Sequence, residues 1–249
     1  MENPFGYLIL FAAGCVAGTV NVIAGGGSFL TLPILMFLGL PPGVANATNR
    51  VGILLQNVAA VWSFDRHGVL DRGALWWAAL PATVGAGLGA SAALVISDDA
   101  FKSVLALLMV AVSLYTLWRP HRQPVPGVAH DPPRSAWLLA AVFFLTGIYG
   151  GFVQAGVGFF LLAATSLAGL DLVRGNAVKV LVVLCFTSLS LAIFVWSGRV
   201  QWLPGLALAA GTILGGLVGA RLTVLKGHRW VRGVVTAAIV VFAIKLWWS

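Results

Sequence analysis

Two cations, Arg50 and Lys179, lie within long apolar stretches of the sequence, where a charged side chain is unusual. A charge at membrane depth is costly and is usually either paired or functional. No acidic residue close in sequence neutralises Arg50. In one interpretation both cations face a central cavity and attract an anion, for which the planar fork of arginine is well suited. In the other, both lie at the membrane interface and extend their charges to water.

Two glycine-rich breaks interrupt the apolar sequence, and each precedes a short apolar run. Gly25-Gly26-Gly27 leads into Ser28, and Gly156-Val157-Gly158 leads into Phe159. A helix broken at such a point exposes backbone N–H groups at the start of its next piece, and these groups favour an anion together with the helix dipole. The alternative is that the glycines serve only close helix packing. We favour broken binding elements for the two clusters. We favour the packing role for Gly14, Gly18, Gly147, Gly151, Gly211, Gly215 and Gly219.

Uncharged polar side chains accompany both breaks and both cations. Asn21 and Gln154 stand just before the glycine clusters, where they could donate hydrogen bonds to an oxyanion or satisfy the loosened backbone. Ser28 is placed either to cap the new helix or to contact a ligand. The candidate substrate-binding residues are Asn21, Gly25, Gly26, Gly27, Ser28, Asn46, Asn49, Arg50, Gln154, Gly156, Gly158, Asn176 and Lys179.

The sequence lacks the motifs on which a membrane-embedded enzyme would depend. It contains no HExxH zinc motif, no nucleotide-binding P-loop and no GxSxG nucleophile motif. The 2 cysteines, Cys15 and Cys185, lie in apolar runs and are too few for a metal site. No obvious carboxylate for a proton relay lies within an apolar run, since Asp171 is expected in a loop. We therefore predict that the protein is not an enzyme and uses no metal or cofactor.

The composition of the chain is that of a membrane protein. Hydrophobic residues make up 60% of the 249 residues and charged residues 9%, with a mean hydropathy of +0.98, whereas a soluble domain is about 25% charged. The net charge of +8 comes mainly from cations in short loops, so we expect no nucleic-acid partner. A crossing needs about 20 apolar residues. The expected segments are 5–24, 28–40, 44–64, 74–96, 100–118, 135–155, 157–172, 176–197, 202–224 and 229–248.

The order of these segments indicates an internal repeat. Each half contains an apolar run, a glycine break, a short run and three long runs. Gly39-Leu40 and Asn46-Ala47 match Gly169-Leu170 and Asn176-Ala177 at one constant offset. We therefore divide the chain into a first repeat at 1–118, a linker at 119–134 and a second repeat at 135–249. The short runs at 28–40 and 157–172 either span fully or are re-entrant.

The positions of lysine and arginine in short loops predict the orientation of the two halves. The loop with Arg66 and Arg72, the linker, and the loop with Lys226, Arg229 and Arg232 are expected in the cytoplasm. The connection with Asp98 and Asp99 is expected outside, and Arg199 is the one exception to the scheme. The expected fold is thus an all-α integral membrane protein of two inverted-topology repeats. Each repeat has a glycine-broken or re-entrant helix pair followed by three transmembrane helices.

The first-half motifs resemble those of a known transporter family. The stretch Gly14–Pro33, the turn Gly39-Leu-Pro-Pro and the helix start Ala45-Asn-Ala-Thr-Asn49 are similar to the sulfite exporter TauE/SafE family, also called the toluene-sulfonate uptake permease family. The second half departs from the pattern, because Ala164 stands where Pro33 does and Asp171-Leu172 replaces Pro41-Pro42. The resemblance implies an inner-membrane permease for small anions, typically sulfite, sulfonates or related organosulfur compounds.

Together these observations predict a multi-pass secondary transporter or facilitator of the cell inner membrane. Its cargo would be a small anion, such as sulfite or a compound like sulfoacetate, moved by alternating access as one repeat rocks against the other. Its partners would be the solute and the lipid bilayer, with a homo-oligomer as a further possibility. The alternatives are an anion channel and a non-transporting membrane scaffold.

Overall fold

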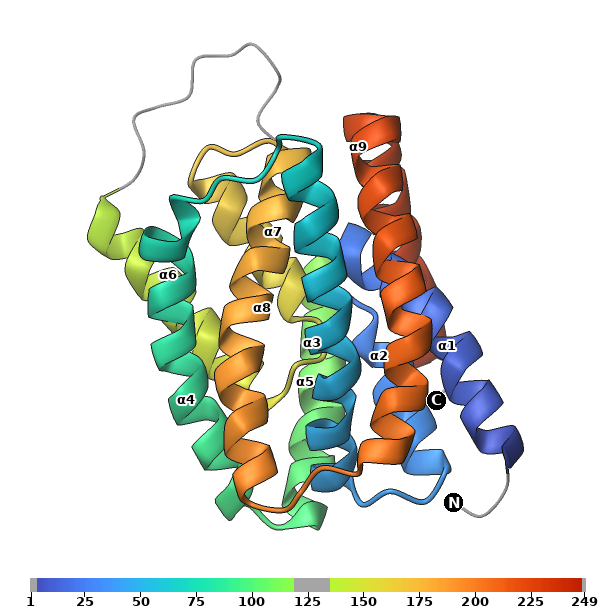
Figure 1. The fold of residues 1–249 in the computed structure, drawn as a ribbon. Coiled ribbons are helices and arrows are strands. Elements are labelled where there is room, and N and C mark those ends of the chain that lie inside the picture. Colours follow the sequence, from blue (N-terminus) through green and yellow to red (C-terminus); the bar gives the residue numbers. More distant parts are fainter. Residues whose placement is uncertain (1–3, 119–134, 248–249) are drawn as a thin grey trace.

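The structure, a computed structural model, describes residues 4–118 and 135–247, and the elements in those ranges are all helical. For residues 108–110, 112–118 and 227–247 it describes the backbone alone. The expected linker, 119–134, lies outside the described residues. The elements (Figure 1) are α1 (Pro4–Ile23), α2 (Ser28–Phe37), α3 (Pro42–Arg66), η1 (Leu75–Ala79, a π-helical turn), α4 (Leu80–Val95), α5 (Asp98–Trp118), α6 (Ala136–Phe152), α7 (Val157–Leu167), α8 (Leu172–Trp196) and α9 (Trp202–Trp247).

The helices carry apolar side chains on their outer faces as well as inside, as contact with lipid requires. Within the described ranges, four helices are long and apolar enough to cross a membrane: Pro4–Ile23, Leu75–Val95, Leu172–Trp196 and Trp202–Lys226. Their exposed apolar side chains include Leu8, Leu88, Leu189 and Val218. A soluble protein rarely exposes so many large apolar groups. The chain is therefore an integral membrane protein, and its described elements are all helical.

Two helices, α2 and α7, are too short to cross a bilayer. They have 10 and 11 residues, so each is about 15–17 Å long against a hydrocarbon core of about 30 Å. Figure 1 shows that α1 and α2 enter and leave at one end of the bundle, and α6 and α7 at the opposite end. The segments predicted at 28–40 and 157–172 therefore each contain a short helix that returns toward the end of the bundle at which the preceding helix begins.

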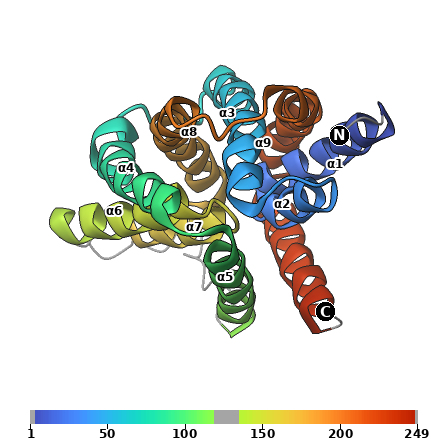
Figure 2. The ribbon, with the colours of Figure 1, turned by 90° about the horizontal axis from the view of Figure 1, so that it is seen from below.

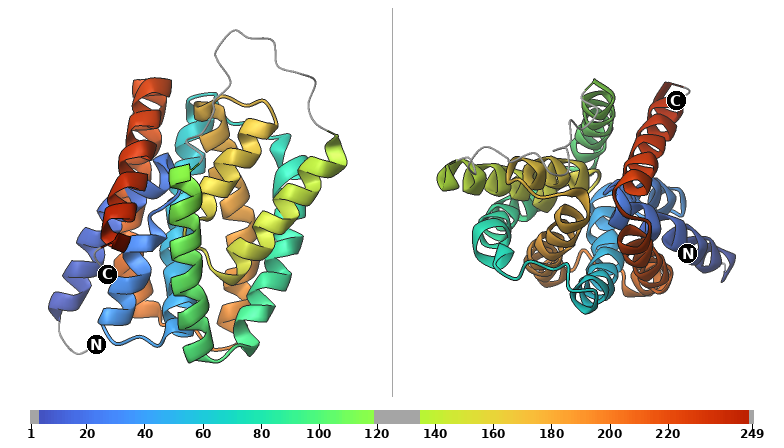
Figure 3. Two further views of the ribbon diagram at one scale, coloured as in Figure 1. Left: turned by 180° about the vertical axis from the view of Figure 1, so that it is seen from behind. Right: turned by 90° about the horizontal axis from the view of Figure 1, so that it is seen from above.

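The C-terminal region differs from the sequence prediction. The segments expected at 202–224 and 229–248 form one helical element, α9 (Trp202–Trp247), so the connection between them is helical rather than a loop. The intervening residues contain no proline, the strongest helix breaker, so the helical backbone continues through Lys226. A straight helix of 46 residues would be about 69 Å long. Instead the ribbon of α9 turns back within its length (Figures 1 and 3).

The helices form two groups that do not coincide with the two halves of the sequence. Figure 2 shows α4, α6, α7 and α8 on one side and α1, α2 and α9 on the other. Helix α3 lies between α8 of the first group and α9 of the second. In the first group α4 packs along α6 and α8, and in the second α9 packs along α1 and α3. Each group thus contains one long helix from the other half of the chain. Any pocket between the groups is consequently built from both halves.

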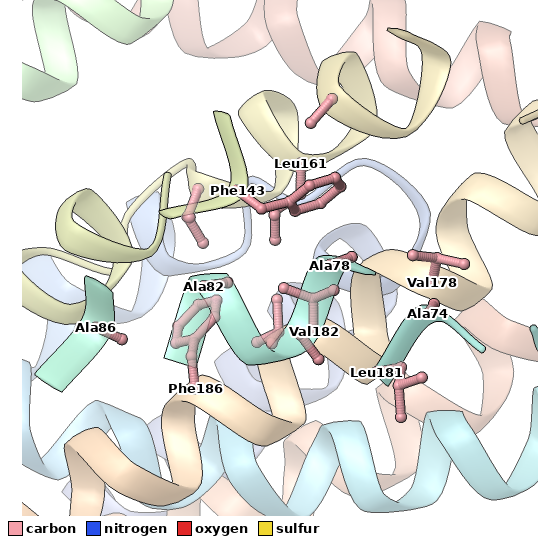
Figure 4. Close-up of a cluster of buried hydrophobic side chains, with 14 of the residues drawn as sticks. Ala74, Ala78, Ala82, Ala86, Phe143, Leu161, Val178, Leu181, Val182 and Phe186 are labelled. Carbon is pink, nitrogen blue, oxygen red and sulfur yellow. The ribbon is translucent and has the colours of Figure 1, made fainter. Parts of the chain in front are cut away.

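Small residues let the helices of each group approach to backbone contact. A Cβ built on Gly85 of α4 would lie 2.1 Å from the carbonyl oxygen of Phe144 in α6, and α1 and α9 meet in the same way through Gly14 and Gly211. Figure 4 shows an alanine stripe, from Ala74 just before η1 to Ala86 in α4, facing apolar side chains of α6, α7 and α8. The labelled residues are Ala74, Ala78, Ala82, Ala86, Phe143, Leu161, Val178, Leu181, Val182 and Phe186. Backbone contacts of this kind confirm the packing role predicted for Gly14, Gly18, Gly147, Gly151, Gly211, Gly215 and Gly219.

Substitution of Gly85 tests this packing. We expect Gly85→Ala to destabilise the protein by more than about 3 kcal/mol, because the new methyl group meets backbone that cannot rotate away. Gly87→Ala is the matched control, since on the same helix its Cβ meets only the end of Leu189 at 3.3 Å. That control should be neutral or stabilising by up to about 1 kcal/mol through helix propensity. Thermal unfolding in detergent measures both, and equal melting temperatures would contradict the packing argument.

Candidate functional site

The two glycine breaks predicted from the sequence meet inside the bundle. A Cβ built on Gly25 would lie 2.3 Å from the Cα of Gly158, and one built on Gly158 would lie 2.2 Å from the Cα of Gly25. Gly25 also has a φ of +91°, a conformation that favours glycine. Immediately beyond, the rings of Phe29 and Phe159 stack with centroids 6.4 Å apart. The starts of α2 and α7 are therefore held together by direct backbone contact between the halves.

Some backbone amides at the starts of α2 and α7 are used within their own turns. The N–H of Phe29 donates to the carbonyl of Gly26 at 3.1 Å, and that of Phe159 to the carbonyl of Gly156 at 3.0 Å. These two donors are therefore engaged locally rather than presented to a ligand. Positive charge at the crossing comes instead from two side chains of the neighbouring helices, Arg50 of α3 and Lys179 of α8.

Ser28 does not cap α2. The N-cap residue is Gly27, which has no side chain to make a capping bond, and Ser28 is the first residue of the helix. The hydroxyl of Ser28 instead accepts a hydrogen bond from Nδ2 of Asn49 at 3.3 Å, and Oγ1 of Thr31 donates to Oδ1 of the same asparagine at 2.7 Å. Asn49 thus ties the first turns of α2 to α3.

Arg50 lies in the third turn of α3 and is fully buried. Its Nη1 donates to the carbonyl of Gly150 at 3.1 Å and to Oε1 of Gln154 at 3.0 Å, and its Nη2 donates to the carbonyl of Gly151 at 2.6 Å. The guanidinium also lies 4.9 Å from the ring centroid of Phe194, a cation–π distance. Its Nε has no partner. The interpretation that Arg50 extends to water is therefore wrong.

Lys179 of α8 is buried in the equivalent way, with 2% of its surface exposed. Its Nζ donates to the carbonyls of Asn21 at 3.0 Å and Val22 at 2.6 Å, and to Oδ1 of Asn176 at 2.7 Å. The interfacial alternative is wrong for this residue as well. Neither cation reaches water, because α3 and α8 begin earlier than the sequence predicted, at Pro42 and Leu172. The additional helical residues before Arg50 and Lys179 place both side chains deep in the bundle.

The two cations cap the broken helices of opposite halves. Arg50, in the first half, binds carbonyls at the end of α6, while Lys179, in the second half, binds carbonyls at the end of α1. The last carbonyls of a helix lack partners and carry the negative end of its dipole, so a cation there is favourable. Asn46 adds a third donor at α6, from its Nδ2 to the carbonyl of Phe152 at 2.9 Å.

A narrow pocket with room for little more than water lies where the breaks and one of the cations come together. It is lined by Asn21, Gly25, Asn57, Gln154, Val157, Gly158, Lys179 and Val183. Five of the predicted site residues therefore share one cavity: Asn21, Gly25, Gln154, Gly158 and Lys179. The other predicted residues are not among those that line it: Gly26, Gly27, Ser28, Asn46, Asn49, Arg50, Gly156 and Asn176.

Sequence reasoning missed two polar residues of this site. Asn57 lines the pocket, and Oγ1 of Thr187 accepts a hydrogen bond from Nε2 of Gln154 at 2.8 Å. Each stands about two helical turns after a buried cation, Asn57 after Arg50 and Thr187 after Lys179, so each shares a helix face with it. Polar residues at that spacing in an apolar helix were the signal.

The buried cations have no carboxylate partner among the described residues. The acidic residues in the described ranges lie at the ends of helices or in connections: Asp65, Asp71, Asp98, Asp99 and Asp171. The ion pairs found there are at the surface, between Arg72 and Asp65 at 3.0 Å and between Arg174 and Asp171 at 3.8 Å. In the same ranges, no group of three or more His, Cys, Asp or Glu residues could hold a metal ion. The site is thus a positively charged, otherwise neutral polar centre.

Comparison with known proteins agrees with the resemblance seen in the motifs. The chain matches the family described as sulfite exporter TauE/SafE over residues 10–246. It is 30% identical over 243 residues to the "Probable membrane transporter protein ORF9" of Sinorhizobium sp., covering 95% of this chain and 90% of the relative. It is 32% identical over 232 residues to a "Probable membrane transporter protein" of Haemophilus influenzae, with coverages of 91% and 89%. It is 28% identical over 252 residues to YfcA of Escherichia coli (strain K12), with coverages of 99% and 91%. No solved structure matches the chain. The match over nearly its whole length shows that this membrane protein belongs to the sulfite exporter TauE/SafE family.

Proposed function

We propose that the protein is a secondary transporter or facilitator that moves a small anion across the cell inner membrane. One observation carries the proposal: Arg50 and Lys179 are buried in the centre of the bundle, and the described residues supply no buried carboxylate to balance them. Burying an uncompensated charge is costly. An anion bound between the two helix groups would supply the missing negative charge.

The proposed cargo is a sulfur oxyanion or organosulfonate, such as sulfite or a compound like sulfoacetate. The family description supports a sulfur anion, and the chemistry of the site is compatible with one. Amide N–H groups, as on Asn21, Gln154 and Asn57, can donate to an anion with several acceptor oxygens, while the ammonium of Lys179 lines the same pocket and supplies positive charge.

We also infer that the two halves are inverted repeats. Several turns support this, because glycines with positive φ recur at one offset: Gly39 (95°) with Gly169 (81°), and Gly68 (67°) with Gly198 (69°). The re-entrant pairs α1–α2 and α6–α7 open to opposite ends of the bundle (Figure 1). Transporters with inverted repeats and broken helices bind their cargo near the midplane, where the repeats meet.

For alternating access, the moving bodies would be the two helix groups rather than the two sequence halves. One body would contain α4, α6, α7 and α8, and the other α1, α2 and α9. The pocket between them is too small for a sulfonate, so binding requires the starts of α2 and α7 to separate. Such a separation is a rigid-body motion that leaves the glycine-packed contacts within each body intact.

Ligand-dependent stabilisation and flux test the proposal. Protein in detergent is heated in sulfite, thiosulfate, sulfate, sulfoacetate, taurine, an aryl sulfonate and carboxylate controls. A ligand of the folded state is expected to add about 2.7 kcal/mol of stability at a hundredfold excess over Kd, and we expect this from a sulfur anion but not from the carboxylates. The same anion should enter proteoliposomes in a saturable way. Conductance without saturation would instead indicate a channel. If no anion of the panel binds and none crosses the membrane, the result contradicts transport.

A further inference from the structure

The ammonium of Lys179 occupies a site formed by oxygen atoms at the C-terminal end of α1. Its Nζ lies 3.0 Å from the carbonyl oxygen of Asn21, 2.6 Å from that of Val22 and 2.7 Å from Oδ1 of Asn176. An ammonium group has three N–H donors, so these three oxygens account for all of them. Backbone carbonyls and amide oxygens are also the ligands that a monovalent metal ion such as Na⁺ takes at the ends of broken transporter helices.

The carbonyls of this site are available because α1 ends abruptly before the glycine break. The N–H groups of Ala24 and Gly25 both turn back to the carbonyl of Val20, at 2.7 and 3.3 Å. The carbonyls of Asn21 and Val22 are thereby left to Lys179. They carry the negative end of the α1 dipole, which makes the position attractive to any small cation.

The same arrangement recurs at the other broken helix. The guanidinium of Arg50 takes the carbonyls of Gly150 and Gly151 and the amide oxygen of Gln154 at the end of α6. Both carbonyl ends where a coupling ion would bind are thus filled by side-chain cations that cannot dissociate. A free Na⁺ near the pocket would meet these two fixed positive charges and, among the described residues, no carboxylate.

We propose that Lys179 is a tethered counter-cation, which fills a monovalent-cation site at the end of α1 and makes a dissociable coupling Na⁺ unnecessary. The anion would then be bound by charge that belongs to the protein, and its affinity would not depend on Na⁺. This last consequence rests on the proposed function, whereas the assignment of the cation site does not. Removal of the ammonium should leave an oxygen-lined position that a free cation can enter.

Two substitutions at the same position test the assignment by thermal unfolding of the purified protein in sodium, potassium or choline gluconate. Lys179→Ala opens the position, whereas Lys179→Met fills it with an apolar chain of similar length. We expect the wild-type melting temperature to be the same in all three salts. Lys179→Ala should be stabilised by Na⁺ or K⁺ relative to choline, by about 3–6 °C at a tenfold excess over Kd. Lys179→Met should not distinguish the salts.

Two outcomes would overturn the proposal: selective stabilisation of the wild-type protein by Na⁺, or a Lys179→Ala protein that melts identically in all three salts. Binding of radioactive Na⁺ to the wild-type protein gives a second measurement, which holds even if Lys179→Ala does not fold. We expect no saturable binding, and saturable binding would contradict the assignment. Sulfite added to the wild-type protein should stabilise it equally in sodium and choline media. If sulfite and the other sulfur anions stabilise in neither medium, the proposed function fails while the cation result stands.

Discussion

Replacing Gly25 by alanine is expected to abolish the folded protein, because steric overlap and backbone strain act together at this position. The methyl carbon would lie 2.3 Å from the Cα of Gly158, far inside contact distance. The opposing atoms are backbone of the second break, so no side chain can rotate to make room. The φ of +91° adds a strain of about 1–2 kcal/mol for a residue with a Cβ. The steric overlap and the backbone strain together are expected to cost more than the whole free energy of unfolding, which is small in folded proteins.

Two further glycines separate the contributions of backbone strain and steric contact. Gly39→Ala carries the strain alone, since its φ is +95° and a Cβ there meets nothing within 4 Å. Gly158→Ala carries the clash alone, because its Cβ would lie 2.2 Å from the Cα of Gly25 while its own φ is not positive. We expect Gly39→Ala to lower stability by about 1–2 kcal/mol and Gly158→Ala to resemble Gly25→Ala. Size-exclusion profiles and melting temperatures in detergent measure all three. If Gly25→Ala behaves like Gly39→Ala, the two breaks do not cross in contact.

Replacing Lys179 by methionine is expected to weaken binding of the cargo anion by about 30- to 1000-fold. A unit charge about 4 Å from an anion contributes roughly 4 kcal/mol at an effective dielectric constant of about 20, and about half of that remains if relaxation and water screen the pair. The corresponding range of about 2–4 kcal/mol converts to the stated change in Kd. Lys179 lines the pocket, so its charge acts at short range. Titration of the purified protein with sulfite, or with the strongest anion of the panel, measures the change.

Two other substitutions serve as controls for Lys179→Met. One tests whether the net charge of the protein matters, and the other whether the shape of a buried cation matters. Lys102→Met removes a cation of the same type from an exposed position on α5 and should leave the anion Kd unchanged. Arg50→Lys keeps the buried charge but loses the fork that holds Gly150 and Gly151, so it should cost affinity less than Lys179→Met does. An unchanged anion Kd in Lys179→Met would remove this residue from the binding site.

Some features of the site were readable from local sequence because they depend on local properties of the chain. Apolar length and charge content decide that segments lie in a membrane. Glycine clusters and short following runs decide where helices break, and α1 and α6 do end just before Gly25 and Gly156. The amides and cations likewise stood out because an apolar helix has few reasons to carry them.

Other features depend on contacts between residues that are distant in sequence, and no local pattern could predict them. Arg50 binds carbonyls 100 and 101 positions away, and Lys179 binds carbonyls 157 and 158 positions away. Whether such cations reach water or helix ends depends on where α3 and α8 begin and on which helices surround them. Contacts between distant residues also decide that α4 packs with helices of the second half of the chain and α9 with helices of the first half.

The sequence by itself thus determined that this is a membrane protein with two broken helices, and it supplied two unpaired cations at matching places. Only the tertiary structure decided that the breaks cross at Gly25 and Gly158 and that each cation caps the helix of the opposite half. The physical reason is that a helix break or a buried charge leaves polar groups that need hydrogen-bond partners, and this follows from the local sequence. Which groups become those partners depends on the packing of helices that are far apart in the sequence.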